Sequence, residues 1–106
     1  MVEQLDLTFA ALADPTRRAM LASMAGRERS IGELAAPHAM TFAGASKHVR
    51  ALERAGLVER RKAGRTQLCR LKAQPLAEAD AWLRQWAGFW EARFDDLDNL
   101  LKRIDP

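Results

Sequence analysis

Three cationic residues in the middle of the chain recur at helical spacing: Lys47, Arg50 and Arg54. In a helix of about 3.6 residues per turn, these positions share one face. The apolar residues of the same segment occupy the opposite face: Ala45, Val49 and Leu52. Guanidinium and ammonium groups donate hydrogen bonds to guanine edges or to phosphates, which is the chemistry of a helix that reads DNA. The alternative is an ordinary solvated helix face.

Further basic residues follow this segment directly. Residues 41–74 contain nine Lys or Arg and two Asp or Glu, so they carry a net charge of +7 in a chain whose total is +3. Such a concentration of charge predicts a polyanionic partner, double-stranded DNA, although a basic surface without a partner is the alternative. The predicted DNA-binding residues come from the basic segment's cap, its outward face and the hairpin after it: Thr41, Ala43, Ser46, Lys47, Arg50, Arg54, Arg61, Lys62 and Arg65.

Two helices are expected before residue 30. Apolar residues at helical spacing predict the first helix over residues 4–13. Asp14 is a suitable N-cap and Pro15 a suitable first residue for the second helix. Gly26 is the expected C-terminal cap of that second helix.

A helix-turn-helix is expected over residues 31–55. Ser30 and Glu33 have the spacing of a capping box, which predicts a short helix beginning at residue 31. Thr41 is the expected N-cap of the basic helix, and Gly56 supplies a left-handed cap at its end. The basic face described above therefore belongs to the second helix of the pair, the position of a recognition helix.

The hydrophobic period changes after the recognition helix. Residues 57–61 and 66–71 read as two short strands, with a turn over residues 62–65 that contains Gly64. This hairpin would be the wing of a winged helix-turn-helix, over residues 57–71. The predicted fold is therefore mainly α with a small β-hairpin, in one domain over residues 1–106.

One long helix is predicted over residues 75–103, with apolar residues three or four positions apart throughout. Three tryptophans on such a helix cannot be covered by so small a monomer, which predicts a homodimer. The expected interface combines the first and last helices: Leu5, Phe9, Leu12, Leu83, Trp86, Trp90, Phe94 and Leu97. The alternative is that Trp82, Trp86, Phe89 and Trp90 line a small-molecule pocket.

Composition excludes several classes of protein. The 106 residues correspond to one domain, and no apolar stretch approaches the roughly 18 residues of a membrane span. No secretory signal opens the chain, so we expect a cytoplasmic protein. A single cysteine, Cys69, rules out an intramolecular disulfide and is expected to be a buried, inert thiol. Because no nucleophile–base pair or glycine-rich phosphate loop is present, we expect no catalytic residues and no enzyme activity.

Three segments of the sequence resemble a known family. The segments FAALADPTRRAML, IGELA and SKHVRALERAGLVERRKAGR resemble the ArsR/SmtB family of bacterial winged-helix repressors, over about residues 7–104. The resemblance implies a homodimer whose interface is formed by the first and last helices. It also implies DNA binding through the fourth helix and the wing, and repression of a nearby operon.

The sequence departs from the metal-sensing members of that family. Their Cys-x-Cys metal pair falls in the segment that here contains Gly32, Glu33 and Ala35, and no histidine follows Pro75 to serve in a last-helix site. The resemblance is therefore to a branch that does not sense metals, with no metal site and no cofactor expected, and it leaves the inducer open. Two alternatives remain: a winged-helix module that binds proteins rather than DNA, and a metal-sensing repressor with atypical ligands.

Overall fold

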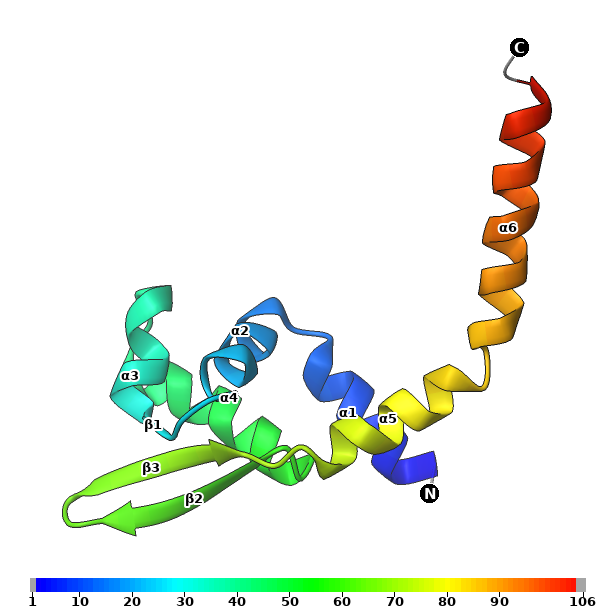
Figure 1. Cartoon of the computed structure of the whole chain (residues 1–106). Coiled ribbons are helices and arrows are strands. Elements are labelled where there is room, and N and C mark those ends of the chain that lie inside the picture. The colour runs from blue at the N-terminus through cyan, green and yellow to red at the C-terminus, as the bar shows by residue number, and fades with distance from the viewer. Residues whose placement is uncertain (1, 105–106) are drawn as a thin grey trace.

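The structure is a computed structural model that describes residues 2–104. The chain forms these elements in order: α1 (Val2–Leu12), α2 (Pro15–Ser23), β1 (Arg29–Ser30), α3 (Ile31–Ala35), the 3-10 turn η1 (Ala36–His38), α4 (Phe42–Arg54), β2 (Val58–Ala63), β3 (Thr66–Leu71), α5 (Gln74–Arg84) and α6 (Ala87–Ile104). Figure 1 shows α2, α3 and α4 grouped beside the β2–β3 hairpin, with α1 crossing α5 and α6 projecting at the far end. This arrangement confirms the predicted mainly helical winged helix-turn-helix.

The hydrophobic core lies where α2, α3 and α4 meet the sheet. The apolar stripe of α4 is fully buried, with Ala45, Val49 and Leu52 at 0% exposure. It packs in one cluster with buried residues of the neighbouring elements, among them Met20 and Leu34. Burying an aliphatic side chain of this size stabilises a fold by about 1.5–3 kcal/mol. The stripe therefore fixes which face of α4 points outward.

The N-terminal caps predicted from the sequence are present. The Asp14 carboxylate accepts hydrogen bonds from the backbone N–H groups of Thr16 and Arg17, at 2.8 and 3.1 Å. The bond from the Arg17 backbone, above all, holds the pKa of Asp14 below its ordinary value. Ser30 and Glu33 form the reciprocal capping box at the start of α3. These local bonds satisfy N–H groups that would otherwise lack partners at the helix starts.

The sheet has one strand more than the predicted hairpin. Its antiparallel order is β1-β3-β2, and the two-residue β1 pairs Arg29 with Cys69 and Ser30 with Leu68. The second wing strand has the predicted bounds, Thr66–Leu71, whereas the first runs two residues further than expected, because Ala63 pairs with Thr66. The predicted four-residue turn is therefore wrong. The turn has two residues, and its Gly64 adopts a φ of +63° that glycine tolerates readily.

Two predictions about helix ends are also wrong. The long helix over residues 75–103 is two helices, because the chain turns at Gln85 and Trp86 between α5 and α6. There the N–H of Trp86 donates to the carbonyl of Leu83 at 3.0 Å, a three-residue step that interrupts the α-helical pattern. The second helix ends at Ser23, and Gly26 does not cap it. Among the described glycines, Gly56 and Gly64 have the positive φ of a left-handed cap, and Gly26 does not.

After the break, α6 packs against no other element within residues 2–104 closely enough to bury any of its residues. No residue of α6 is buried, and the chain measures 65 × 33 × 21 Å. Its radius of gyration is 18.6 Å, against about 13 Å for a compact domain of this length. No helix within residues 2–104 is long and apolar enough to cross a membrane.

Candidate nucleic-acid interface

The outward face of α4 presents the predicted cations. Lys47, Arg50 and Arg54 are exposed, and within residues 2–104 none of them forms an ion pair. They lie opposite the buried stripe of the helix, so packing of that stripe directs all three side chains into solvent. Ala43 is exposed on the same face and Ser46 is half-buried at its edge. The charges of this face are therefore available to an anion.

The start of α4 is fixed by its cap. The Thr41 hydroxyl accepts a hydrogen bond from the backbone N–H of Gly44 at 3.0 Å. A Cβ added at Gly44 would stand 3.3 Å from that hydroxyl, so a side chain there would crowd the cap. Thr41 is thus placed as an N-cap whose side chain is occupied by the helix itself.

The tip of the wing carries two cations without partners. Lys62, near the end of β2, and Arg65, in the two-residue turn, are exposed, and no ion pair joins either of them to any described residue. Gly64 between them keeps the turn narrow. A narrow basic tip of this kind suits contact with phosphates or with the minor groove.

The other arginines of the wing are held by carboxylates of the same chain. Arg61 forms two hydrogen bonds with Glu28, from Nε to Oε2 at 2.7 Å and from Nη2 to Oε1 at 2.9 Å. This pairing lowers the pKa of the Glu28 carboxyl and raises that of the Arg61 guanidinium. Arg61 is therefore paired with Glu28, whereas Lys62 and Arg65 at the tip are unpaired among the described residues.

Two more arginines are paired in the same way. Arg60 reaches Glu53 of α4, with its Nη2 2.7 Å from Oε1, and joins the wing to the recognition helix. The Nε of Arg70 donates to Glu59 across the hairpin at 2.8 Å, and this bond lowers the pKa of Glu59. The partners lie 7 and 11 residues apart in the sequence, on different elements. The net charge of +7 counted for residues 41–74 already includes Glu53 and Glu59, so of the three wing pairs only Arg61–Glu28 lowers it further.

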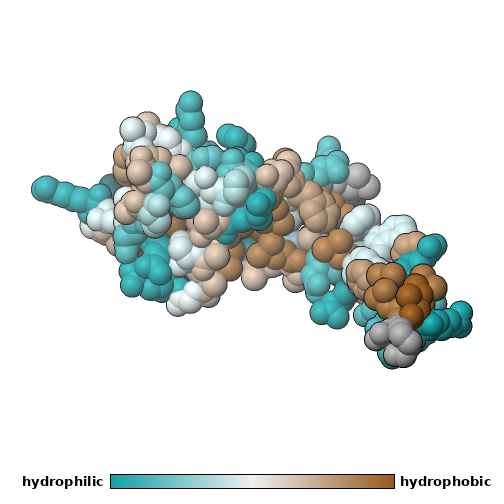
Figure 2. Space-filling model, turned by 90° about the horizontal axis from the view of Figure 1, so that it is seen from above, coloured by the Kyte–Doolittle hydropathy of each residue, from teal (hydrophilic) through white to brown (hydrophobic). Residues whose placement is uncertain are grey.

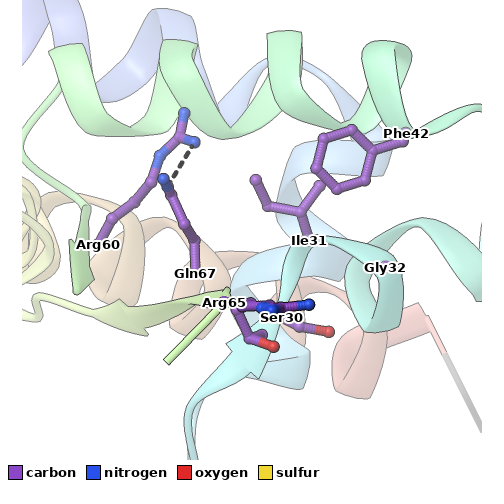
Figure 3. Close-up of a pocket in the computed structure, with 8 residues that line it drawn as sticks. Ser30, Ile31, Gly32, Phe42, Arg60, Arg65 and Gln67 are labelled. Carbon is purple, nitrogen blue, oxygen red and sulfur yellow. Dashed lines mark hydrogen bonds between the residues drawn. The ribbon is translucent and has the colours of Figure 1, made fainter. Parts of the chain in front are cut away.

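A groove of about 480 Å³ separates the wing from the starts of α3 and α4. Figure 3 shows the residues around it, with Arg65 near Ser30 and the Phe42 ring beside Ile31. The wing contributes mainly polar groups to the groove, and the helix side contributes apolar ones. These residues line it: Ser30, Ile31, Gly32, Phe42, Arg60, Arg65, Thr66 and Gln67.

Sequence reasoning missed Phe42. Its position in the helical repeat places it beside the buried stripe of α4, so the pattern alone marks it as a core residue. In the structure it is 65% exposed, because the first turn of α4 extends past the core. The signal that could have revealed it is its place directly after the Thr41 cap, where a helix has not yet entered the core.

The predicted dimer residues form an apolar surface at the other end of the chain. In Figure 2 hydrophobic residues gather over the middle of the molecule and on the projecting α6. Phe9 of α1 meets Trp82 of α5 edge to face, with ring centroids 5.9 Å apart. The exposed members of the predicted set are Phe9, Leu83, Trp86, Trp90, Phe94 and Leu97. Leu5 and Leu12 are half-buried, and Leu12 packs against the core of its own chain.

The remaining candidate chemistry is limited. In the part of the chain from residue 2 to residue 104, no three His, Cys, Asp or Glu side chains lie together as a metal site would require. Cys69 is buried on β3, as predicted, and burial raises the pKa of its thiol. A buried thiol with a raised pKa is a poor nucleophile and a poor metal ligand.

Comparison with solved structures decides the family. The structure of an ArsR family transcriptional regulator is 37% identical in sequence, covers 86% of this chain and 94% of its own, and superposes with a TM-score of 0.78. The chain belongs to the ArsR family. A helix-turn-helix domain family also matches residues 12–61, which run from the end of α1 into β2.

Other ArsR structures show the same winged fold. An ArsR-like transcriptional regulator from Rhodococcus sp. RHA1 is 28% identical over 93% of both chains, with a TM-score of 0.72. A domain of a possible ArsR-family regulator from Mycobacterium bovis is described as a homodimeric winged helix-turn-helix DNA-binding domain. It is 30% identical over 82% of this chain and 81% of its own, with a TM-score of 0.67. None of the curated proteins is similar enough in sequence to match.

Proposed function

We propose that this ArsR-family chain is a homodimeric, sequence-specific DNA-binding regulator that acts in the cytoplasm and represses a nearby operon. The observation that carries the proposal is the separation of paired from unpaired cations. Three wing arginines are neutralised within the chain, whereas the cations of α4 and of the wing tip remain free. Free cations on one face of a helix-turn-helix are what a DNA backbone requires.

The proposal assigns different tasks to the two groups of free cations. Arg50 lies on the face of α4 that would enter the major groove, where a guanidinium can bond a guanine edge. Arg65 lies at the wing tip, where it would meet phosphates and hold the protein on the duplex without reading sequence. Lys47, Arg54 and Ser46 would assist on α4, with Thr41 and Ala43 beside them, and Lys62 would assist at the tip.

Dimerisation is supported by the apolar surface of α1, α5 and α6. A helix that projects from its own chain with exposed large side chains is stable in water when a second copy covers it. The M. bovis domain with this fold is described as homodimeric. Two recognition helices in such a dimer would contact half-sites about 34 Å apart, one turn of DNA.

We further propose that metal ions do not regulate DNA binding by this protein. Gly32, Glu33 and Ala35 stand where metal-sensing members of the family have their cysteine pair. We therefore place it in the branch that does not sense metals.

The test starts by selecting a preferred duplex from a random pool with the purified protein. Fluorescence anisotropy then measures the dissociation constants of wild type, Arg50→Ala and Arg65→Ala on that duplex and on unrelated DNA. Arg50→Ala should weaken the selected duplex by about 1–3 kcal/mol more than unrelated DNA. Arg65→Ala should weaken both equally. If both variants lose affinity equally on both duplexes, α4 is not the reader. If wild type binds no duplex, the protein-binding alternative replaces this proposal.

A further inference from the structure

An exposed aromatic ring stands at the entrance of the recognition helix. Phe42 is the first residue of α4, and it is 65% exposed, more than Trp86 or Trp90 of the proposed dimer interface. It lines the groove between the wing and the starts of α3 and α4, and no residue of the predicted dimer set lines that groove. The proposed dimer interface therefore does not include Phe42.

Phe42 lines one side of the groove of about 480 Å³ described above. Figure 3 shows the ring on the α4 side, with the Arg65 guanidinium on the side of the wing. Arg65 is a phosphate-binding group, whereas a phenyl ring can neither donate to a phosphate nor neutralise it. A DNA strand in this groove would therefore turn its phosphates toward the wing and its sugars and base edges toward Phe42.

The chemistry of the ring selects the group that it contacts. A phenyl ring offers no hydrogen-bonding group, so its removal from water is favourable when it packs against another apolar surface. In the major groove, where a recognition helix lies, the apolar group of a base edge is the C5-methyl of thymine. Guanine, cytosine and adenine present hydrogen-bonding groups there, which Phe42 cannot satisfy.

We infer that Phe42 is a specificity-determining residue that selects thymine by packing against its C5-methyl group. This inference rests on the proposed DNA-binding function and adds an apolar contact to the hydrogen-bonding residues of α4. The duplex would remove the Phe42 ring from water, and the ring would keep the position that it has in the free protein.

The test removes the methyl group from the DNA and the ring from the protein in turn. The preferred duplex is prepared with thymine and with uracil, which differ only by the C5-methyl. Anisotropy then gives the dissociation constants of wild type, Phe42→Ala, Phe42→Leu and Arg50→Ala on both duplexes. Wild type should bind the uracil duplex about fourfold more weakly for each half-site, the loss expected for one methyl group left in water.

Phe42→Ala should bind both duplexes equally, at about the affinity of wild type for the uracil duplex. Phe42→Leu, which keeps an apolar side chain, should retain part of the preference for thymine. Arg50→Ala should retain all of it while binding more weakly overall, which shows that the preference does not depend on Arg50. Phe42→Ala controls for any change of DNA shape caused by uracil, because such an effect would persist without the ring. Far-ultraviolet circular dichroism checks that each variant is folded.

Two results would overturn the inference while leaving the proposed function standing: a wild type indifferent to uracil, or a Phe42→Ala variant that still discriminates. A Phe42→Ala variant that loses affinity equally on selected and unrelated DNA would also overturn it, because the ring would then contact only the sugar–phosphate backbone. A wild type that binds no duplex would overturn both the inference and the proposed function.

Discussion

The pairing of Arg61 predicts that two arginines of one hairpin contribute very differently to the salt dependence of DNA binding. Arg65 is free at the tip, whereas Arg61 holds Glu28 with bonds of 2.7 and 2.9 Å. Changing either residue to alanine removes one positive charge per chain. The two variants therefore have the same net charge and serve as matched controls for long-range electrostatics.

The magnitude follows from counterion release. Each phosphate that a cation neutralises contributes about 0.9 to the slope of log affinity against log salt concentration. A dimer carries two wings, so Arg65→Ala removes two contacts and should make the slope shallower by about 1.8. Arg61→Ala should leave the slope unchanged, because the carboxylate of Glu28 already neutralises that guanidinium.

The assay is a salt titration by fluorescence anisotropy on unrelated duplex DNA, where base contacts do not interfere. A third variant, Glu28→Gln, frees Arg61 and should make the slope steeper than that of wild type. Equal reductions for Arg61→Ala and Arg65→Ala would refute the reasoning. They would show that Arg61 leaves Glu28 for a phosphate when DNA arrives.

Four further predictions concern the dimer, the core, the thiol and metals. Replacing Trp90 and Phe94 together by glutamate should convert the dimer to monomers or insoluble protein in light scattering. A wild type that is monomeric at micromolar concentration would contradict the proposed interface. Leu52→Ala should lower the free energy of unfolding in urea by about 2–5 kcal/mol, because the side chain is fully buried; a loss below about 1 kcal/mol would refute that packing. The Cys69 thiol should react with a disulfide reagent at pH 8 only as fast as the protein unfolds, since its 0% exposure keeps the reagent out and burial also raises its pKa. Immediate reaction would be the contrary result. Chelators or added zinc should leave DNA affinity unchanged, and a tenfold change would reveal a metal site.

The sequence was sufficient wherever structure is decided by a few neighbouring residues. Asp14, Ser30 with Glu33, and Thr41 each satisfy backbone N–H groups within three positions, so their chemistry is visible in a short window. The left-handed φ of +74° at Gly56 was predictable for the same reason. The fold class and the outward face of α4 follow from such local signals together with hydrophobic periodicity.

What could not be predicted depends on contacts between distant segments. Strand β1 exists because Arg29 and Ser30 pair with β3, about 40 positions later in the chain, and a pair of residues has no periodicity. Glu28 and Arg61 are separated by 33 positions, so nothing local indicates that they meet. The break between α5 and α6 was hidden for another reason, because the apolar spacing continues through Leu83 and into the turn.

The two-residue turn at Gly64 and Arg65 constrains how the wing can change in length during evolution. Inserting one residue into each strand would move the tip outward by about 3.4 Å but would turn its side chains to the opposite face of the hairpin. Inserting two residues into each strand restores the original face and moves the tip by about 7 Å. That displacement equals about two base-pair steps along the axis of a DNA duplex. A wing of this design therefore gains reach in units of four residues, each unit moving its cations outward by about 7 Å.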